Sequence, residues 1–340
     1  MVEQPQSAMA QEIAEIPDGA ERLLSSSDTI ASLTQRITGY GPRFVVLCGR
    51  GSSGHVGVYL RYLFETKLGL ITSAAAPSVF TAYDARPDMR GALFIVISQS
   101  GRSPDLVTAT EAARELGALT LAILNDEASP AAEASELVLP IRAGREHAVA
   151  ATKTVALSMM AGALLVAALS SDDDLSDALR RLPSRFRKAL ACDWRDWREA
   201  LTEAPAAFAA GRGYSFGPAR ETALKITEAL RIPGLGFSTA ELRHGPRAAI
   251  DPSTPVLIFR QNDQTATSSG SLIHDLSEAR ENVFCVGGAG CTLPWIGDDH
   301  PICDSIAMLL PAYRAIEAAA RARGLDPDNP PHLAKITRTL

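Results

Sequence analysis

The chain has 340 residues, which is enough for two domains of ordinary size. Hydrophobic residues make up 46% of it and charged residues 21%, as in a globular protein with a large core. The formal net charge of −6 argues against broad electrostatic binding to nucleic acid, which needs clustered cations.

The N-terminus and the cysteines indicate the cellular compartment in which the protein is located. The residues from Met1 to Gln6 lack the basic and apolar segments of a secretory signal. The most apolar run, 155–169, is shorter than a membrane span needs, so it predicts a buried core helix. Five scattered cysteines without a Cys-x-x-Cys pair favour reduced thiols over disulfides or a zinc site. We therefore expect a cytoplasmic protein that binds no membrane.

Short apolar runs alternate with helical segments through the first half. The runs are 44–48, 93–97 and 119–124, and helices are expected at about 53–68 and 104–116. Continuous apolar runs that alternate with helices are typical of a parallel sheet covered on both faces. The sequence thus predicts an α/β fold.

The pattern then repeats at an offset of 162 residues, from Gly49-Arg-Gly51 to Gly211-Arg-Gly213. At the same offset, the runs 255–260 and 284–286 repeat the later strands. Three matches at a single offset predict two tandem domains of the same kind. We place a helical lead-in at 1–40, the first domain at 41–175, the second at 176–325 and a C-terminal tail that closes the site at 326–340.

Two loops of the first domain are candidate ligand sites. The segment Ser98–Asp105 follows a strand, carries three serines and Gly101, and leads into a helix whose N-terminus favours an anion. The alternative is an ordinary helix start capped by Ser103. The equivalent loop of the second domain, 260–263, has no serine, so only the first domain is predicted to bind phosphate. In the loop 49–54, Ser52 and Ser53 are interpreted as hydroxyls that face a polyol.

These segments resemble the sugar-isomerase (SIS) family, and in particular the isomerase half of glutamine–fructose-6-phosphate transaminase. The resemblance runs from about residue 9 to 336. The matching segments are Gly51-Ser-Ser53, Ser98-Gln-Ser-Gly101 with Ser103, Val149-Ala-Ala-Thr-Lys153, Glu221-Thr-Ala-Leu-Lys-Ile-Thr-Glu228, Glu241-Leu-Arg-His-Gly-Pro246 and Asn329-Pro-Pro-His-Leu-Ala-Lys335.

The resemblance implies two tandem SIS domains and a role for each matching residue. Glu228 would be the base that moves a proton between C1 and C2, and His244, from a neighbouring subunit, would assist ring opening. Lys225 and Lys335 would complete the catalytic set. The sugar phosphate would be bound by Ser98, Gln99, Ser100 and Ser103, and the sugar by Ser52, Ser53, Glu221 and the backbone at Val149 and Ala151.

The chain also departs from the transaminase pattern. Val2 follows Met1 where the transaminase has a catalytic cysteine, and the segment 9–17 resembles the linker that enters the isomerase half. Ala151 stands where the transaminase usually has serine. The resemblance to a transaminase without its glutaminase domain implies deamination, as in SIS-type glucosamine-6-phosphate deaminase.

The alternatives to these roles come from the residues themselves. Glu221, Lys225 and Glu228 share one face of a helix predicted at 217–230, and such a face is often a surface salt-bridge pattern. Lys335 could be an exposed tail residue, and His244, before Gly245, an ordinary turn residue.

The expected reaction converts glucosamine 6-phosphate and water into fructose 6-phosphate and ammonia. Proton transfer on an open-chain sugar needs no redox cofactor, and the six histidines show no metal-ligand spacing, so we expect neither cofactor nor metal. We expect a homodimer with a shared active site. The alternatives are a fructosamine-6-phosphate deglycase, a galactosamine-6-phosphate deaminase/isomerase, a synthase subunit supplied with ammonia by a separate glutaminase, or a non-catalytic sugar-phosphate-binding protein.

Overall fold

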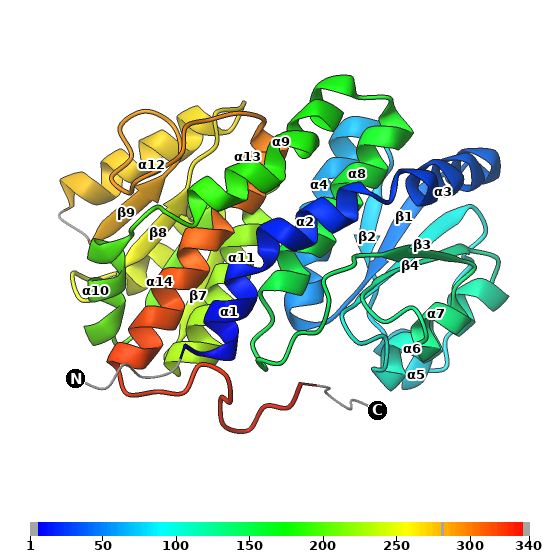
Figure 1. The fold of residues 1–340 in the computed structure, drawn as a ribbon, viewed down its shortest axis with the longest axis horizontal. Helices are drawn as coiled ribbons and strands as arrows, with labels where there is room; N and C mark the ends of the chain where they lie inside the picture. The colour runs from blue at the N-terminus through cyan, green and yellow to red at the C-terminus, as the bar shows by residue number, and fades with distance from the viewer. Residues whose placement is uncertain (1–5, 280–281, 336–340) are drawn as a thin grey trace. The chain divides into compact units, whose positions relative to one another are not determined.

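The computed structural model describes residues 6–279 and 282–335, which form two compact units with one β-sheet each (Figure 1). We call them the first-sheet unit and the second-sheet unit. The first-sheet unit comprises 18–145, 154–180 and 334–335, and the second-sheet unit comprises 6–17, 146–153, 181–279 and 282–333.

The first sheet has five parallel strands in the order β2-β1-β3-β4-β5. Both β3 and β4 are buried along their whole length, which explains their continuous apolar sequence. Because β1 pairs with β2 on one side and β3 on the other, the strand order reverses between β1 and β3. The strands are β1 Phe44–Cys48, β2 Thr72–Ala74, β3 Ala92–Ser98, β4 Leu119–Leu124 and β5 Leu137–Pro140.

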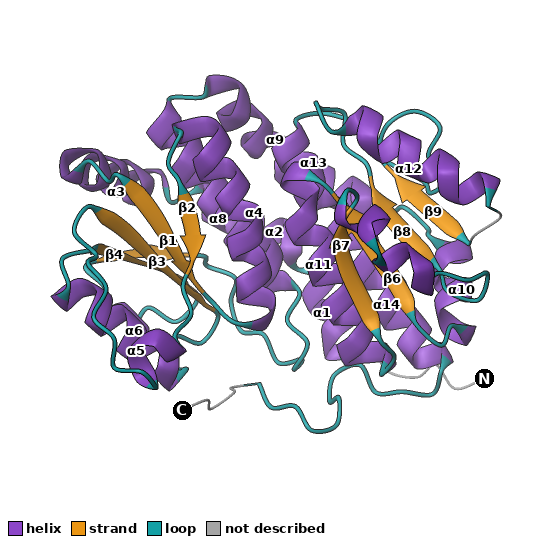
Figure 2. Ribbon diagram, turned by 180° about the vertical axis from the view of Figure 1, so that it is seen from behind, coloured by secondary structure: helices purple, strands orange, loops and turns teal. Residues whose placement is uncertain are grey.

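Helices cover the first sheet on both faces (Figure 2). On one face, Phe94 and Val96 of β3 pack with Leu106 and Ala109 of α6. Helix α8 is long and apolar enough to cross a membrane, but 78% of it is buried inside the protein, as in a core helix. The helices of this part of the chain are α2 Ile16–Leu24, α3 Ser27–Tyr40, α4 Gly51–Leu68, α5 Ser78–Thr81, α6 Pro104–Glu115, α7 Pro130–Ala134, α8 Lys153–Ser170 and α9 Asp173–Ala189.

The second sheet repeats this topology with four parallel strands in the order β7-β6-β8-β9. The reversal again falls between the first and third strands of the unit, β6 and β8. The predicted α/β architecture of two mainly parallel sheets is therefore confirmed. The strands are β6 Ala207–Gly211, β7 Gly234–Ser238, β8 Val256–Phe259 and β9 Val283–Val286.

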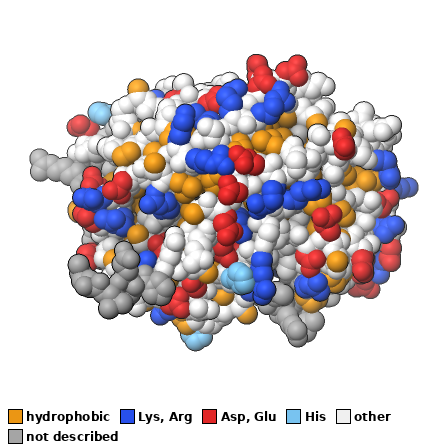
Figure 3. Space-filling view, viewed as in Figure 1, with side chains coloured by type: hydrophobic (Ala, Val, Ile, Leu, Met, Phe, Trp, Pro, Cys, Tyr) orange, Lys and Arg blue, Asp and Glu red, His pale blue; other side chains and the backbone are white. Residues whose placement is uncertain are grey.

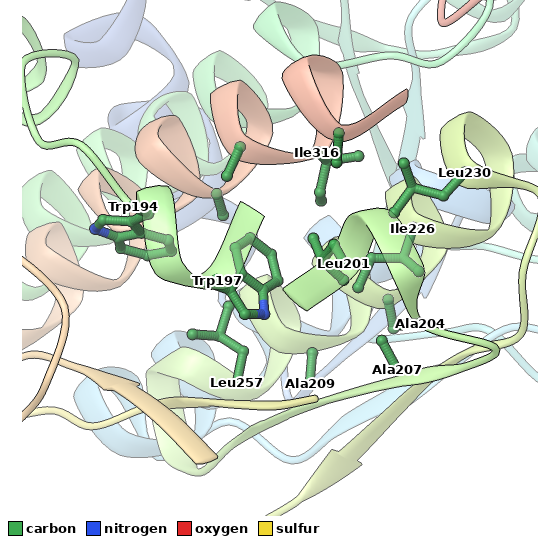
Figure 4. Close-up of a cluster of buried hydrophobic side chains, with 14 of the residues drawn as sticks. Trp194, Trp197, Leu201, Ala204, Ala207, Ala209, Ile226, Leu230, Leu257 and Ile316 are labelled. Carbon is green, nitrogen blue, oxygen red and sulfur yellow. The ribbon is translucent and has the colours of Figure 1, made fainter. Parts of the chain in front are cut away.

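The second sheet is also covered on both faces. Alternate residues of β6 point to opposite sides: Ala207 and Ala209 face one hydrophobic cluster, and Phe208 and Ala210 face another. Figure 4 shows the first cluster, where Trp197 lies among helix and strand residues. The helices are α1 Ala8–Ala14, α10 Arg195–Glu203, α11 Phe216–Lys225, α12 Ala266–Glu278, α13 Pro301–Ala307 and α14 Leu309–Ala322, with short 3-10 turns Gly213–Ser215, Glu241–His244 and Pro246–Ala249 and a π-helical turn Ile226–Leu230.

Candidate functional site

The topology of the first-sheet unit brings the two candidate loops to one edge of the sheet. Ligands of open parallel sheets bind beyond the carboxyl ends of the strands, where the strand order reverses. Here that position lies between β1 and β3. Ser52 and Ser53 lie in the first turn of α4, directly after β1, and the segment Ser98–Ser103 directly follows β3.

An ion pair joins these two loops. Arg50 Nε donates to Asp105 Oδ2 at 2.7 Å, and Asp105 lies in the first turn of α6. The Asp105 side chain is 1% exposed, whereas that of Arg50 is 51% exposed. The pair therefore ties the start of α4 to the start of α6 and leaves the buried carboxylate of Asp105 paired.

Backbone geometry fixes the loop after β3. The Gly101 N–H donates to Ser98 Oγ at 3.0 Å, and the Arg102 N–H donates to Ser100 Oγ at 3.3 Å. Gly101 has φ of +64°, and a Cβ added there would lie 2.0 Å from Ser129 Oγ. Only glycine fits this position without moving a neighbour, so the tight turn depends on it.

The Ser103 hydroxyl remains available for a ligand. Ser103 occupies the N-cap position of α6, but its side chain makes no capping hydrogen bond. The alternative of a helix start capped by the Ser103 hydroxyl is therefore wrong. A half-buried hydroxyl beside the positive end of a twelve-residue helix, with Gln99 close by in the chain, can bind an anion.

The equivalent edge of the second sheet is occupied by its own polar groups. Gln261 Oε1 accepts a hydrogen bond from the Ser215 N–H at 3.0 Å, and the Ser215 hydroxyl donates to the Phe259 carbonyl at 3.1 Å. Asp263 Oδ1 accepts the Thr265 N–H at 2.8 Å. These groups are satisfied internally, which favours the prediction that phosphate binds only in the first-sheet unit.

The second-sheet unit instead contains a buried charge cluster on α11 and the π-helical turn that follows it. Lys225 Nζ lies 3.5 Å from Glu221 Oε1 and contacts Glu228 Oε2 directly. The side chains of Glu221 and Lys225 are both fully buried. The alternative of a surface salt-bridge face is therefore wrong for these two residues, because the face packs into the protein.

Tyr313 and Glu146 complete this cluster. The Tyr313 hydroxyl, buried on α14, donates to Glu221 Oε1 at 3.4 Å. Burial and the Glu221 and Glu146 carboxylates raise the pKa of Tyr313 well above its ordinary value. Burial alone would lower the pKa of Lys225, but the carboxylates of Glu221, Glu228 and Glu146 outweigh it and raise that pKa. Lys225 therefore stays an ammonium group and Tyr313 a neutral phenol.

Glu228 is the member of the cluster that a ligand can reach. Its side chain is 18% exposed, whereas those of Lys225 and Glu221 are fully buried. It lies in the π-helical turn Ile226–Leu230, and such turns occur often at functional sites. A partly exposed carboxylate whose other side is fixed by an ammonium group can accept and return a proton.

The segment 146–152 is positioned by its backbone hydrogen bonds. Glu12 of α1 is buried and accepts the N–H groups of His147 and Ala148. The Val149 N–H donates to the Asp328 carbonyl at 3.0 Å. Val149 and Ala151 are half-buried and alternate with buried residues, so this side of the segment can contact a ligand.

The remaining predicted residues are His244 and Lys335. His244 is exposed on the turn Glu241–His244, and among the described residues no hydrogen bond or ion pair joins it to the Lys225 cluster. Lys335, the last described residue, is half-buried. Within 6–279 and 282–335, no group of three His, Cys, Asp or Glu side chains has the arrangement to hold a metal ion.

Sequence reasoning missed Glu146 and Tyr313. Each is a single residue far in the chain from α11, and neither lies in a pattern that points to Lys225. The only available signal was indirect: a helix with a buried lysine and two carboxylates needs further polar partners from other elements.

Comparisons with known proteins agree with this architecture. The SIS domain family model matches residues 41–168 and 200–285. The glutamine–fructose-6-phosphate aminotransferase (isomerizing) of Methanothermobacter thermautotrophicus is 32% identical over 338 residues, which cover 96% of this chain and 56% of that enzyme. The chain thus spans little more than half the length of this curated relative.

Two crystal structures have a similar fold. One, from Silicibacter pomeroyi and described as a "putative phosphosugar isomerase", is 36% identical with a TM-score of 0.91 and covers 95% of this chain and all of that one. The other, a glucosamine-6-phosphate deaminase from Thermotoga maritima, has a TM-score of 0.79 over 98% of this chain and all of that one. Its 23% identity shows a shared fold alone.

Proposed function

The chain belongs to the SIS domain family, and from this premise we propose that it is an enzyme that acts on a phosphorylated amino sugar. The specific reaction we propose is the isomerising deamination of glucosamine 6-phosphate to fructose 6-phosphate and ammonia. Two features support a phosphorylated sugar as substrate: a serine-rich loop at a helix N-terminus, and a proton-accepting carboxylate in a largely buried cluster.

The reaction has three steps on the open-chain sugar. A base removes the C2 proton of the aldose while the C1 carbonyl oxygen takes up a proton, which gives an enolamine with a hydroxyl group on C1. The C2 proton is then returned to C1 and the nitrogen releases one N–H proton, which leaves a ketimine at C2 and replaces the proton that the C1 oxygen took up. Water adds to the ketimine carbon and ammonia departs, so atoms and charge balance without an oxidant or reductant. One carboxylate on one face of the sugar suffices for both proton transfers.

We assign the base to Glu228, and its partial exposure beside Lys225 is the observation that carries the proposal. Lys225 holds the carboxylate in place by direct contact, and Glu221 and Tyr313 in turn hold Lys225. In this proposal Ser98, Gln99, Ser100 and Ser103 bind the phosphate, and Ser52, Ser53, Val149 and Ala151 contact the sugar. Lys335 covers it.

The test is ammonia release from glucosamine 6-phosphate by the purified chain, with fructose 6-phosphate measured in parallel. Equal amounts of both products support the proposal. The variant Glu228→Gln keeps the size and polarity of the side chain, and should lower kcat by roughly 10²–10⁴-fold because it removes the base. The control is Glu278→Gln, an exposed carboxylate at the end of α12, which should keep full activity.

Two results would contradict the proposal. Equal activity of Glu228→Gln and Glu278→Gln would remove Glu228 from the reaction. If no ammonia appears, yet fructose 6-phosphate protects the chain against thermal unfolding, phosphate binding by the loop after β3 is supported and the deaminase assignment is wrong. A sugar-phosphate-binding protein without this activity would then be the better description.

We also propose that the active chain is a homodimer in which His244 acts across the subunit boundary. The exposed position of His244 on its turn supports this proposal, because an exposed histidine is accessible to a second copy. Two inactive variants, Glu228→Gln and His244→Ala, should recover part of the activity when mixed as hybrids. Verified hybrids without activity would refute a shared site.

A further inference from the structure

A cavity of about 390 Å³ lies within the second-sheet unit, along α1 and beside α14. This volume is within the range of small-molecule sites, roughly 300–1,000 Å³. None of its lining residues belongs to the loop after β3 or to the Lys225 cluster. The charged residues of the lining are Asp193, Arg198, Arg314, Glu317 and Arg321.

Three of these residues are arginines with few hydrogen-bond partners. Arg314 donates one N–H to the Leu190 carbonyl. Arg198 Nη2 is 3.5 Å from a carboxylate oxygen of Glu199, and Arg321 Nη1 is 3.9 Å from one of Glu317. A guanidinium has five N–H donors, so within the described residues most donors of these three groups are left for a ligand.

The acidic residues of the cavity do not cancel this charge. Glu317 is mostly buried and accepts the Ser7 hydroxyl at 2.7 Å, and Asp193 lies 3.6 Å from Arg195, outside the lining. Three guanidinium groups against two carboxylates leave a positive cavity in a chain whose net charge is −6. Figure 3 shows the mixture of basic and acidic side chains on the face where α10 and α14 lie.

We propose that this cavity is a binding site for a small phosphate monoester, separate from the loop after β3. Guanidinium groups bind phosphate oxygens in pairs of parallel hydrogen bonds, which gives both affinity and orientation. The alanines at 10, 14, 315 and 318 leave room for the carbon skeleton of the ester. The proposal does not depend on the deaminase activity, because no residue of the cavity takes part in that reaction.

The experiment is hydrogen exchange of the full chain with and without glycerol 3-phosphate, read out by segment. Binding in the cavity should slow exchange in the segments 6–16, 188–200 and 311–323, apart from any effect on 98–103. In the double variant Arg198→Gln/Arg321→Gln, the concentration of glycerol 3-phosphate needed for half of this protection should rise about tenfold or more, because two charge-assisted contacts are removed. Both side chains are about one-third exposed, so the fold should persist.

Two further variants make the test specific. Ala318→Leu fills the cavity without a change in charge and should also abolish the protection. Arg195→Gln removes an arginine from the same segment but outside the lining, and should leave the protection unchanged. Protection confined to 98–103, or equal protection in Arg198→Gln/Arg321→Gln and the wild-type chain, would overturn the proposal.

Discussion

Replacement of Lys225 by methionine should destabilise the second-sheet unit strongly. Methionine fills nearly the same volume, so the change removes the charge rather than the packing. Glu221, which is fully buried, would lose the cation 3.5 Å away, and the neutral Tyr313 hydroxyl that donates to it would not replace that charge. The loss of one partner from a buried ion pair costs roughly 3–5 kcal/mol, and we expect the upper part of this range because Glu146 and Glu228 lose the same cation.

Lys153 provides a matched comparison within the same unit. It is also a buried lysine, with 1% of its side chain exposed, and its Nζ lies 2.6 Å from Glu15. The Glu15 side chain is 55% exposed, however, so water can solvate it after the loss of Lys153. We therefore expect Lys153→Met to cost less free energy than Lys225→Met, although both variants remove one buried ammonium group.

Tryptophan fluorescence during urea unfolding is the appropriate measurement. All three tryptophans, 194, 197 and 295, belong to the second-sheet unit, so the signal reports on the unit that is perturbed. Adding Glu221→Gln to Lys225→Met should restore at least about 2 kcal/mol, because the orphaned charge disappears while the amide can still accept from Tyr313.

The reasoning would be refuted by either of two results. One is a free-energy loss for Lys225→Met no larger than that for Lys153→Met. The other is a double variant with Glu221→Gln that is no more stable than Lys225→Met alone. Each would mean that the cluster contributes through packing rather than through charge compensation.

Three further predictions concern other parts of the chain. Gly101→Ala should raise KM for the sugar phosphate at least about tenfold, because the added Cβ would clash with Ser129 Oγ, and adding Ser129→Gly should reverse part of this increase. An unchanged KM in Gly101→Ala would contradict the loop geometry. Ser103→Ala should change the melting temperature little, since its hydroxyl makes no capping bond, but should weaken phosphate binding in calorimetry; a stability loss of about 1 kcal/mol would indicate a cap instead. Burial raises the pKa of Asp304 to about 6 in the folded chain, so as the pH rises this carboxyl loses its proton in the unfolded chain before it does in the folded one. Between about pH 4 and pH 7 the free energy of unfolding of the wild-type chain should therefore fall by roughly 3 kcal/mol relative to that of Asp304→Asn. Identical pH profiles of the two proteins would refute this.

Most of the sheet architecture was accessible from the sequence because parallel strands buried on both faces must be continuously apolar. The runs 44–48 and 119–124 coincide with β1 and β4, and β3 extends the run 93–97 by one residue at each end. The internal offset located β6, β8 and β9 within a residue or two. Short strands such as β2, with only three residues and two of them exposed, carry too little apolar pattern to be recognised.

The site was only partly predictable. The loop after β3 can be recognised from the local sequence, because its serines and Gly101 lie within a few residues of one another. The surroundings of Lys225 do not, because burial depends on elements that are distant in the chain. Helical spacing placed Glu221, Lys225 and Glu228 on one face, but whether that face meets water or Tyr313 is decided by the packing of α14.

Burial also separates the roles of the two glutamates that contact Lys225. Glu221 is fully buried, and its carboxylate accepts a hydrogen bond from the Tyr313 hydroxyl. Glu228 lies in the π-helical turn, where the extra residue per turn shifts its side chain relative to an ordinary helix and 18% of it stays exposed. A carboxylate that is held from the buried side and open on the other needs little rearrangement when a substrate arrives. The buried charges thus hold the partly exposed Glu228 carboxylate in place, which is the arrangement that the proposed role of Glu228 as a base requires.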